Sequence, residues 1–337
     1  MNSIQNELID IRNSCENTIT CSRLLSCEET IVAVEIVHSL TIKLIACLRF
    51  PIDGYPKNCL LIELKSKTLS DRFLNNLTKI CEEHCKSNLL GKEQVIAFLK
   101  FLSNTLQKNP LCVCHDELIS LKEFALKANF TLKLCQRRSC IILKSRFHNY
   151  IFNVEATIPP EYPYSKIEWT LFEGNFPNNL MRYLNAQAKE IVRKNVEPPL
   201  REYKNEPSFK VQPCLEKTCK FLILTIQYFL NEVCPVCKQK CLPKNSKDIV
   251  TDEDNQWFVE RAHCGHIYHS GCLQKIFLEP PFPIEGKLCL ATDSKEEACR
   301  QKLTHYKWTL NSKKAEQRWA HKNAKDRELK EIEDFLS

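Results

Sequence analysis

Hydrophobic and polar residues alternate through the first two thirds of the chain in patterns that predict a helix, then strands, then helices. Ile4, Leu8 and Ile11 recur at helical spacing and predict an amphipathic helix within residues 3–15. Downstream patterns predict three strands and then two helices, at 31–37, 40–48 and 60–64, and at about 69–86 and 92–107. Asn109-Pro110 ends this stretch, because a residue before proline is disfavoured in a helix.

The same order of elements recurs between residues 111 and 232. The pattern predicts a helix, four strands and two helices, at 117–128, at 130–134, 139–147, 150–156 and 167–171, and near 178–193 and 216–232. In each half a proline-containing loop precedes the last strand, with Tyr55-Pro56 in the first half and Tyr162-Pro163 in the second. The recurrence predicts a duplicated unit of one helix, three strands and two helices.

The Tyr-Pro loop between two strands, followed by two helices, resembles the RWD domain, a relative of ubiquitin-conjugating enzymes that lacks their catalytic cysteine. The signature of that family is Tyr-Pro-x-x-x-Pro, and here Leu60 and Ile167 stand in place of its last proline. The resemblance implies an α+β protein with two RWD-like α/β sandwich units, at 1–110 and 111–232. An unrelated α+β sandwich is the alternative. We expect Tyr55 and Tyr162 to lock their loops as core residues.

Six cysteines and two histidines fall at metal-ligand spacing in the region that follows. Cys234-Pro-Val-Cys237 opens it, and a Cys-x-His-x-x-His-x-x-Cys motif comes after a polar insert. The four ligands of that second motif would crowd a single ion, so we expect two zinc ions with alternating ligand pairs. One ion would then be bound by Cys234, Cys237, His269 and Cys272, and the other by Cys264, His266, Cys289 and Cys299.

The order Cys, Cys, Cys, His, His, Cys, Cys, Cys resembles a RING finger of the two-histidine type, here at 233–304. The family normally ends in Cys-Pro-x-Cys, whereas nine residues separate Cys289 from Cys299. His305 or Cys241 could therefore replace one of those two ligands.

RING fingers of ubiquitin ligases hold a ubiquitin-loaded conjugating enzyme, and three positions match residues that do so. Val236 lies inside the first Cys-x-x-Cys motif, Ile276 or Phe277 follows the sixth ligand by one turn, and Arg300 directly follows the last ligand. The resemblance implies a ligase that acts by positioning the thioester, with no residue of the chain modified covalently. A non-catalytic zinc-binding scaffold is the competing interpretation, favoured by the insert at 238–262 and by the unusual last pair.

The order of domains is similar to that of RWD-RING ubiquitin ligases, the class to which the Fanconi anaemia core-complex ligase belongs. It implies a conjugating enzyme as the partner of the finger, and a protein substrate or complex partner for the RWD-like units.

Charge and composition argue against several other classes of protein. The net charge is +7, but the 48 basic residues are dispersed among 41 acidic ones, so we expect no nucleic-acid site. We expect no signal sequence, since the first residues lack its charged, apolar and small-residue pattern, and apolar runs such as 221–230 are too short to cross a membrane. The chain has 20 cysteines, so we expect a reducing cytoplasmic or nuclear setting, in which the fourteen outside the finger mainly pack in cores. Hydrolase, phosphate-loop and dinucleotide motifs are missing.

The last segment, 305–337, predicts one long charged helix. Residues 311–336 contain no glycine or proline and have apolar residues at a rough helical spacing, namely Ala315, Trp319, Leu329, Ile332 and Phe335. We expect this helix to pack on the finger or on the second α/β unit, with a partner-binding helix as the alternative.

Overall fold

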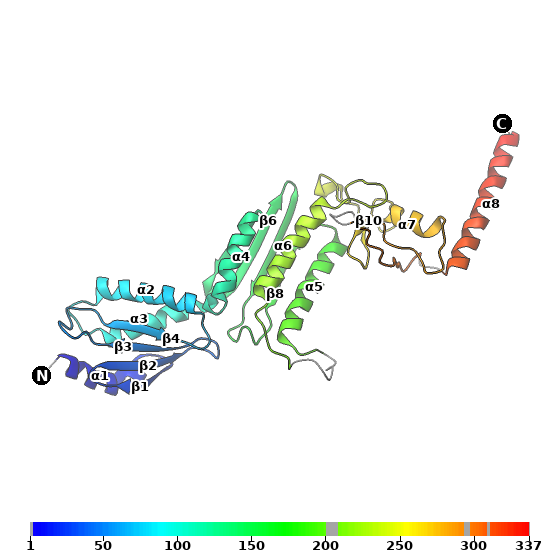
Figure 1. Cartoon of the computed structure of the whole chain (residues 1–337). Helices are drawn as coiled ribbons and strands as arrows, with labels where there is room; N and C mark the ends of the chain where they lie inside the picture. The colour runs from blue at the N-terminus through cyan, green and yellow to red at the C-terminus, as the bar shows by residue number, and fades with distance from the viewer. Residues whose placement is uncertain (1–2, 200–207, 293–296, 309–310, 337) are drawn as a thin grey trace. The chain divides into compact units, whose positions relative to one another are not determined.

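The computed structural model describes residues 3–199, 208–292, 297–308 and 311–336 (Figure 1). These residues form helices, two four-stranded sheets and one two-stranded sheet, so the predicted α+β class is confirmed. They divide into two compact units. The first contains residues up to Ser145, Asn153–Glu173 and Gln187–Phe221, and the second contains Arg146–Phe152, Gly174–Ala186 and the described residues from Leu222 onward. No described helix is both long enough and apolar enough to cross a membrane.

The first sheet is an antiparallel meander that follows one helix and precedes two. Its elements are α1 (Ser3–Thr18), β1 (Ser22–Cys27), β2 (Ile31–Val37), β3 (Lys43–Arg49), β4 (Leu61–Lys65), α2 (Asp71–Asn88) and α3 (Val95–Lys108). Alternate residues of β2 and β3 are buried, as the period of two of a strand requires. They pack with the apolar faces of the helices in a single core.

Strand β1 is absent from the sequence prediction, and the predicted unit of three strands is therefore wrong in the first half. The strand has no β-branched residue, and none of its residues is fully buried. It forms an edge of the sheet, and its register with β2 shifts between Leu24 and Ser26. An edge strand of this kind lacks the strong hydrophobic alternation by which strands are recognised.

The second sheet repeats the order of the first. After a short 3-10 turn, η1 (Pro110–Cys114), come α4 (His115–Lys127), β5 (Phe130–Cys135), β6 (Cys140–Phe147), β7 (Tyr150–Thr157), β8 (Glu168–Gly174), α5 (Asn178–Val196) and α6 (Leu215–Asn231). A second short turn, η2 (Gln136–Arg138), joins β5 to β6. The strand orders are β1-β2-β3-β4 and β5-β6-β7-β8. Both halves therefore run helix, four strands, two helices.

The two Tyr-Pro loops are tied down by the same hydrogen-bond device. In the first half, Tyr55 donates to the carboxylate of Glu7 in α1 and accepts from the backbone N–H of Gln94 at 3.1 Å. Glu7 also accepts from the N–H of Val95 at 2.7 Å. The loop, the first helix and the start of α3 are thus joined through two side chains.

In the second half, Tyr162 donates to Glu117 of α4 at 2.5 Å and accepts from the N–H groups of Cys214 and Leu215 at 2.8 and 3.0 Å. Glu117 accepts from the N–H of Glu216 at 3.0 Å. Burial raises the pKa of both Glu117 and Tyr162, which shows that both side chains are largely removed from water. Their hydrogen bonds offset the free-energy cost of that burial. Both Tyr-Pro bonds are cis. The expected loop-locking role is the one these tyrosines perform.

The remaining elements belong to the region of the predicted finger and the segment after it. They are η3 (Ser246–Asp248), β9 (Val259–Arg261), β10 (Ile267–His269), α7 (Ser270–Leu278) and α8 (Ser312–Leu336), and β9 pairs with β10 in an antiparallel ribbon.

Side chains of the second half hold this region. Tyr150 donates to the carbonyl of Pro243 at 2.8 Å, and Asn179 donates to that of Val259 at 2.6 Å. Arg261 lies over the ring of Tyr183, with its guanidinium carbon 3.6 Å from the ring centroid. The end of the β6–β7 hairpin and the start of α5 therefore form part of the same compact unit as the finger region.

Candidate metal centre

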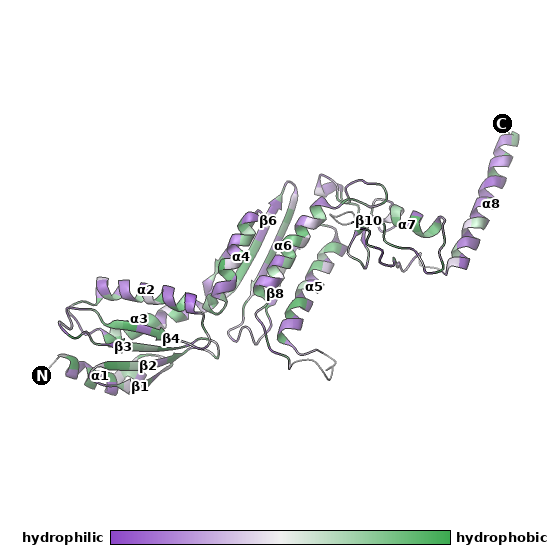
Figure 2. Cartoon of the chain, in the orientation of Figure 1, coloured by the Kyte–Doolittle hydropathy of each residue, from purple (hydrophilic) through white to green (hydrophobic). Residues whose placement is uncertain are grey.

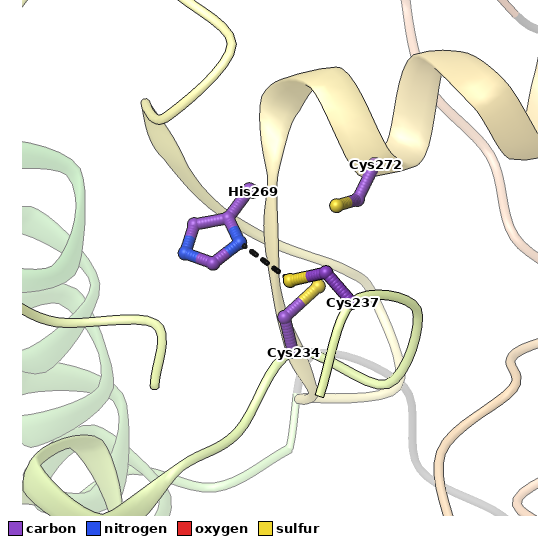
Figure 3. A group of neighbouring side chains, drawn as sticks. All are labelled: Cys234, Cys237, His269 and Cys272. Carbon is purple, nitrogen blue, oxygen red and sulfur yellow. Dashed lines mark hydrogen bonds between the residues drawn. The ribbon is translucent and has the colours of Figure 1, made fainter. Parts of the chain in front are cut away.

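One cluster brings together Cys234, Cys237, His269 and Cys272, whose side chains point toward a common centre in Figure 3. Their ligand atoms all lie within 4.8 Å of one another, and Cys237 Sγ is 3.3 Å from His269 Nδ1. A tetrahedral zinc ion with Zn–S bonds of about 2.3 Å would place its sulfurs about 3.8 Å apart. A small contraction of the cluster would therefore close it around one ion.

Local backbone structure aims these side chains. The turn after Cys234 is closed by hydrogen bonds from Lys238 N–H to the Cys234 carbonyl and from Cys234 N–H to the Gln239 carbonyl, at 2.9 and 2.8 Å. Lys238 has a φ of 58°, which reverses the chain directly after Cys237. His269 ends β10 and Cys272 lies in the first turn of α7, so the ribbon and the helix meet at the cluster.

A second cluster brings together Cys264, His266, Cys289 and Cys299, again with all ligand atoms within 4.8 Å. Gly265 has a φ of +102° in a turn closed by its own N–H and the Ala262 carbonyl at 2.9 Å. That conformation favours glycine, and it places Cys264 and His266 on the same side of the turn. Cys289 Sγ lies 3.5 Å from His266 Nδ1.

The long interval between Cys289 and Cys299 is spanned by two facing segments of chain. Cys289 N–H donates to the Gln301 carbonyl at 2.8 Å, and Cys299 N–H donates to the Ala291 carbonyl at 2.9 Å. Antiparallel bridges join Leu288 to Lys302 and Thr292 to Ala298. The two cysteines thus come together across a ladder, which replaces the short Cys-Pro-x-Cys turn.

The two alternative ligands lie outside both clusters. Cys241 is buried and its thiol donates to the Ile267 carbonyl at 3.4 Å. His305 Nε2 lies 2.5 Å from Glu260, and the His305 ring stacks on Trp308 with centroids 4.1 Å apart. The clusters therefore contain the eight residues first expected from the spacing.

Sequence reasoning missed Tyr268, a fully buried residue between the two histidines. Its hydroxyl lies 2.9 Å from Cys289 Sγ and accepts from the N–H of Leu290 at 3.2 Å. Groups that hydrogen-bond to metal ligands orient them and tune their basicity. In the sequence, Tyr268 stands out only because it lies between two expected ligands. That position does not show which way its side chain points.

The protonation of the thiols differs between positions. Burial raises the pKa of Cys272 and of Cys289 to about 12, whereas a hydrogen bond with the Cys241 thiol lowers the pKa of Cys234. A metal ion binds thiolates, so it must displace the protons of the two thiols whose pKa is raised.

The chemistry of the donors fits zinc at both clusters. Each offers three sulfurs and one imidazole nitrogen, a set typical of structural zinc sites. Four protein ligands leave no coordination position for water, so such an ion contributes to folding and not to Lewis-acid catalysis. These two clusters could hold two metal ions.

Next to the first cluster lies an apolar groove of about 660 Å³. Val236 and Ile276 both line it and are half-buried, together with the exposed side chains of Ile284, Leu288 and Leu290. Phe277, the other predicted partner residue of the helix, is buried at 6% exposure beside Trp308, so it belongs to the core. Arg300 is exposed, has a φ of 51° and is not among the residues that line the groove.

Comparison of the chain with known proteins gives no further assignment. No protein-family model matches it, and no curated protein has a significant sequence match.

Proposed function

We propose that this chain is a RING-type ubiquitin ligase. In this proposal residues 233–304 bind two zinc ions and dock a ubiquitin-loaded conjugating enzyme, and two RWD-like units at 1–110 and 111–232 bind a protein substrate or complex partner. The observation that carries it is the apolar groove that Val236 and Ile276 share, next to one of two interleaved Cys₃His clusters.

The groove supplies what such docking needs. Apolar surface beside a charged, rigid module usually marks a partner site. Val236 comes from the first turn of the finger and Ile276 from α7, and the cluster of Cys234, Cys237, His269 and Cys272 ties those two elements together. Zinc supplies the folding energy that fixes the groove.

Catalysis in this proposal is positional. The conjugating enzyme carries the thioester, and the finger holds it in a conformer ready for attack by a substrate amine. Arg300 is exposed directly after the last ligand of the second cluster, where its guanidinium could hydrogen-bond ubiquitin and the conjugating enzyme together.

A non-catalytic zinc-binding scaffold is the second candidate. The polar insert at 238–262 first favoured it, but that insert has a packing role here. Ser246 accepts from Asn175 at 2.7 Å, and the Val259 carbonyl accepts from Asn179. These contacts hold the finger region on the second half of the chain and leave the groove open.

Discharge of ubiquitin from a panel of loaded conjugating enzymes tests the proposal. Wild-type protein should accelerate discharge from at least one of them, and Val236→Arg should abolish the acceleration, because a charge in the groove opposes apolar docking. Val233→Arg is the matched control, since Val233 is 40% exposed on the same turn and does not line the groove. Both variants should retain two zinc ions per chain by metal analysis.

Arg300→Ala separates docking from activation. It should slow discharge while leaving the affinity for the conjugating enzyme nearly unchanged. If zinc-loaded wild-type protein neither binds nor discharges any conjugating enzyme, the ligase proposal is wrong and the scaffold takes its place.

A further inference from the structure

Helix α8 leaves most of its surface in water. Of its 25 residues only Ala315 is buried, and its first half contacts the finger through Trp319, whose ring centroid is 6.4 Å from that of Phe282. Beyond that point the aliphatic and aromatic side chains are exposed, Leu329 at 50%, Ile332 at 55% and Phe335 at 90%. An otherwise hydrophilic helix (Figure 2) thus carries an uncovered apolar end.

The charges of α8 run against its own dipole. Residues 312–325 contain five Lys or Arg and one Glu, whereas residues 326–336 contain five acidic residues and two basic ones. The first turn has no acidic residue and the last turn no basic one. A helix alone is stabilised by the opposite arrangement, with acids at the start and bases at the end.

Like charges also lie one turn apart. Lys314, Arg318 and Lys322 follow at intervals of four, a spacing that destabilises an isolated helix. Among the described ion pairs, none involves these three residues. The arrangement is therefore suited to an anionic surface outside one chain.

Two of these cations, Arg318 and Lys322, border a groove of about 800 Å³ between α7 and the first half of α8. Cys237, His269 and Cys272 of the first cluster lie at its inner end, and the acidic Glu279 and Asp326 also line it. Three of the four tryptophans in the chain line it, Trp257, Trp308 and Trp319, together with Arg318 and Lys322. An occupant that fits must be apolar along one side and acidic on its flanks.

The second half of α8 has this chemistry. Leu329, Ile332 and Leu336 lie on one side of the helix at intervals of three and four, and Glu328 and Glu333 flank that side. When two copies of α8 run antiparallel, the basic first half of each helix faces the acidic second half of the other. The two helix dipoles then point in opposite directions, which is the favourable arrangement. A two-fold axis repeats the contact at both ends.

We propose that this chain forms a homodimer through antiparallel α8 helices, in which the apolar, acidic end of each helix fills the tryptophan-lined groove of the other copy. This interface goes beyond ubiquitin transfer, and it does not depend on whether the finger is a ligase.

The mass of the full-length, zinc-loaded protein in solution gives the first test. Sedimentation across a concentration series should show a dimer, and rising salt should weaken it, because the charged flanks are exposed. Ile332→Asp should give a monomer. Leu126→Asp, at a residue of α4 that is 76% exposed, should leave the dimer intact and controls for the loss of an exposed aliphatic side chain.

Charge reversal gives the sharper test. A chain with Arg318→Glu and Lys322→Glu has an acidic α8, and a chain with Glu328→Lys and Glu333→Lys has a basic one. Each alone should be monomeric, and an equimolar mixture should form a heterodimer. Reversal of two exposed lysines of α2, Lys79→Glu and Lys86→Glu, changes the net charge as much as the first of these chains does and should leave the homodimer unchanged.

Wild-type protein that stays monomeric throughout the series overturns the proposal. So does a mixture of the two reversed chains that fails to associate, because the interface depends on that complementarity. Either result would leave the discharge assay of the finger unaffected, so the two proposals fail separately.

Discussion

At the scale of single residues, side chains outside the two clusters help to fix the position of the cluster residues. Tyr268 is the clearest instance, since it is fully buried and its hydroxyl lies against Cys289 Sγ and accepts from Leu290 N–H. Removing the hydroxyl takes away the acceptor of the Leu290 N–H and one of the hydrogen-bond partners of the Cys289 sulfur.

We predict that Tyr268→Phe loosens the second metal site, raising the rate of zinc loss to a chromogenic chelator by roughly tenfold. One of the two ions should leave faster and the other should be unaffected, because Tyr268 contacts a ligand of one cluster only. Tyr306→Phe serves as the control, since Tyr306 is 77% exposed and far less constrained. Equal release rates for wild type and Tyr268→Phe would show that the hydroxyl does not support Cys289.

At the scale of elements, the sequence predicts best where side chains alternate strongly. Strands β2 and β3 alternate between buried and half-buried residues, and both were predicted within a few residues. Strand β1 was missed because an edge strand with partly exposed residues has no such alternation. Spacing also predicted the four residues of the first cluster, because Cys-x-x-Cys and His-x-x-Cys turns bring such side chains close together.

The pairing of Cys289 with Cys299 did not follow from spacing alone. It depends on a ladder of backbone hydrogen bonds between 287–292 and 298–303. The residue types in these two segments do not predict that ladder. Likewise, the sequence does not distinguish Ile276 from Phe277 as the partner-binding residue of α7. Only the packing of α7 shows that one faces the core and the other the groove.

We predict that Cys299→Ala lowers the zinc content from two ions per chain to one, because the second cluster loses a ligand that the ladder brings into place. Cys241→Ala should keep both ions, since Cys241 lies outside both clusters and touches the first only through a hydrogen bond with Cys234. Metal analysis of both purified variants decides the matter. The reverse result would make Cys241 a ligand and remove Cys299 from the site.

At the scale of the whole molecule, the finger region and parts of the second α/β half lie in one compact unit. Both belong to one compact unit, joined by Tyr150 to Pro243, Asn179 to Val259 and Arg261 to Tyr183. The first sheet and its helices have their own core, from Leu8 to Cys112. The destabilisation that follows loss of the metal should therefore reach the second half of the chain and leave the first core intact.

The last prediction is the effect of chelation on hydrogen exchange. Structural zinc contributes on the order of 10 kcal/mol to small modules of this kind, so its removal should unfold residues 233–304. Gly174–Ala186 should then exchange faster, because Asn179 and Tyr183 lose their contacts with Val259 and Arg261 of the finger region. Helices α2 and α3 should keep the protection of the zinc-loaded protein. Unchanged exchange at the start of α5 would show that its contacts with the finger add no stability, and faster exchange in α3 would show that the first core depends on the metal as well.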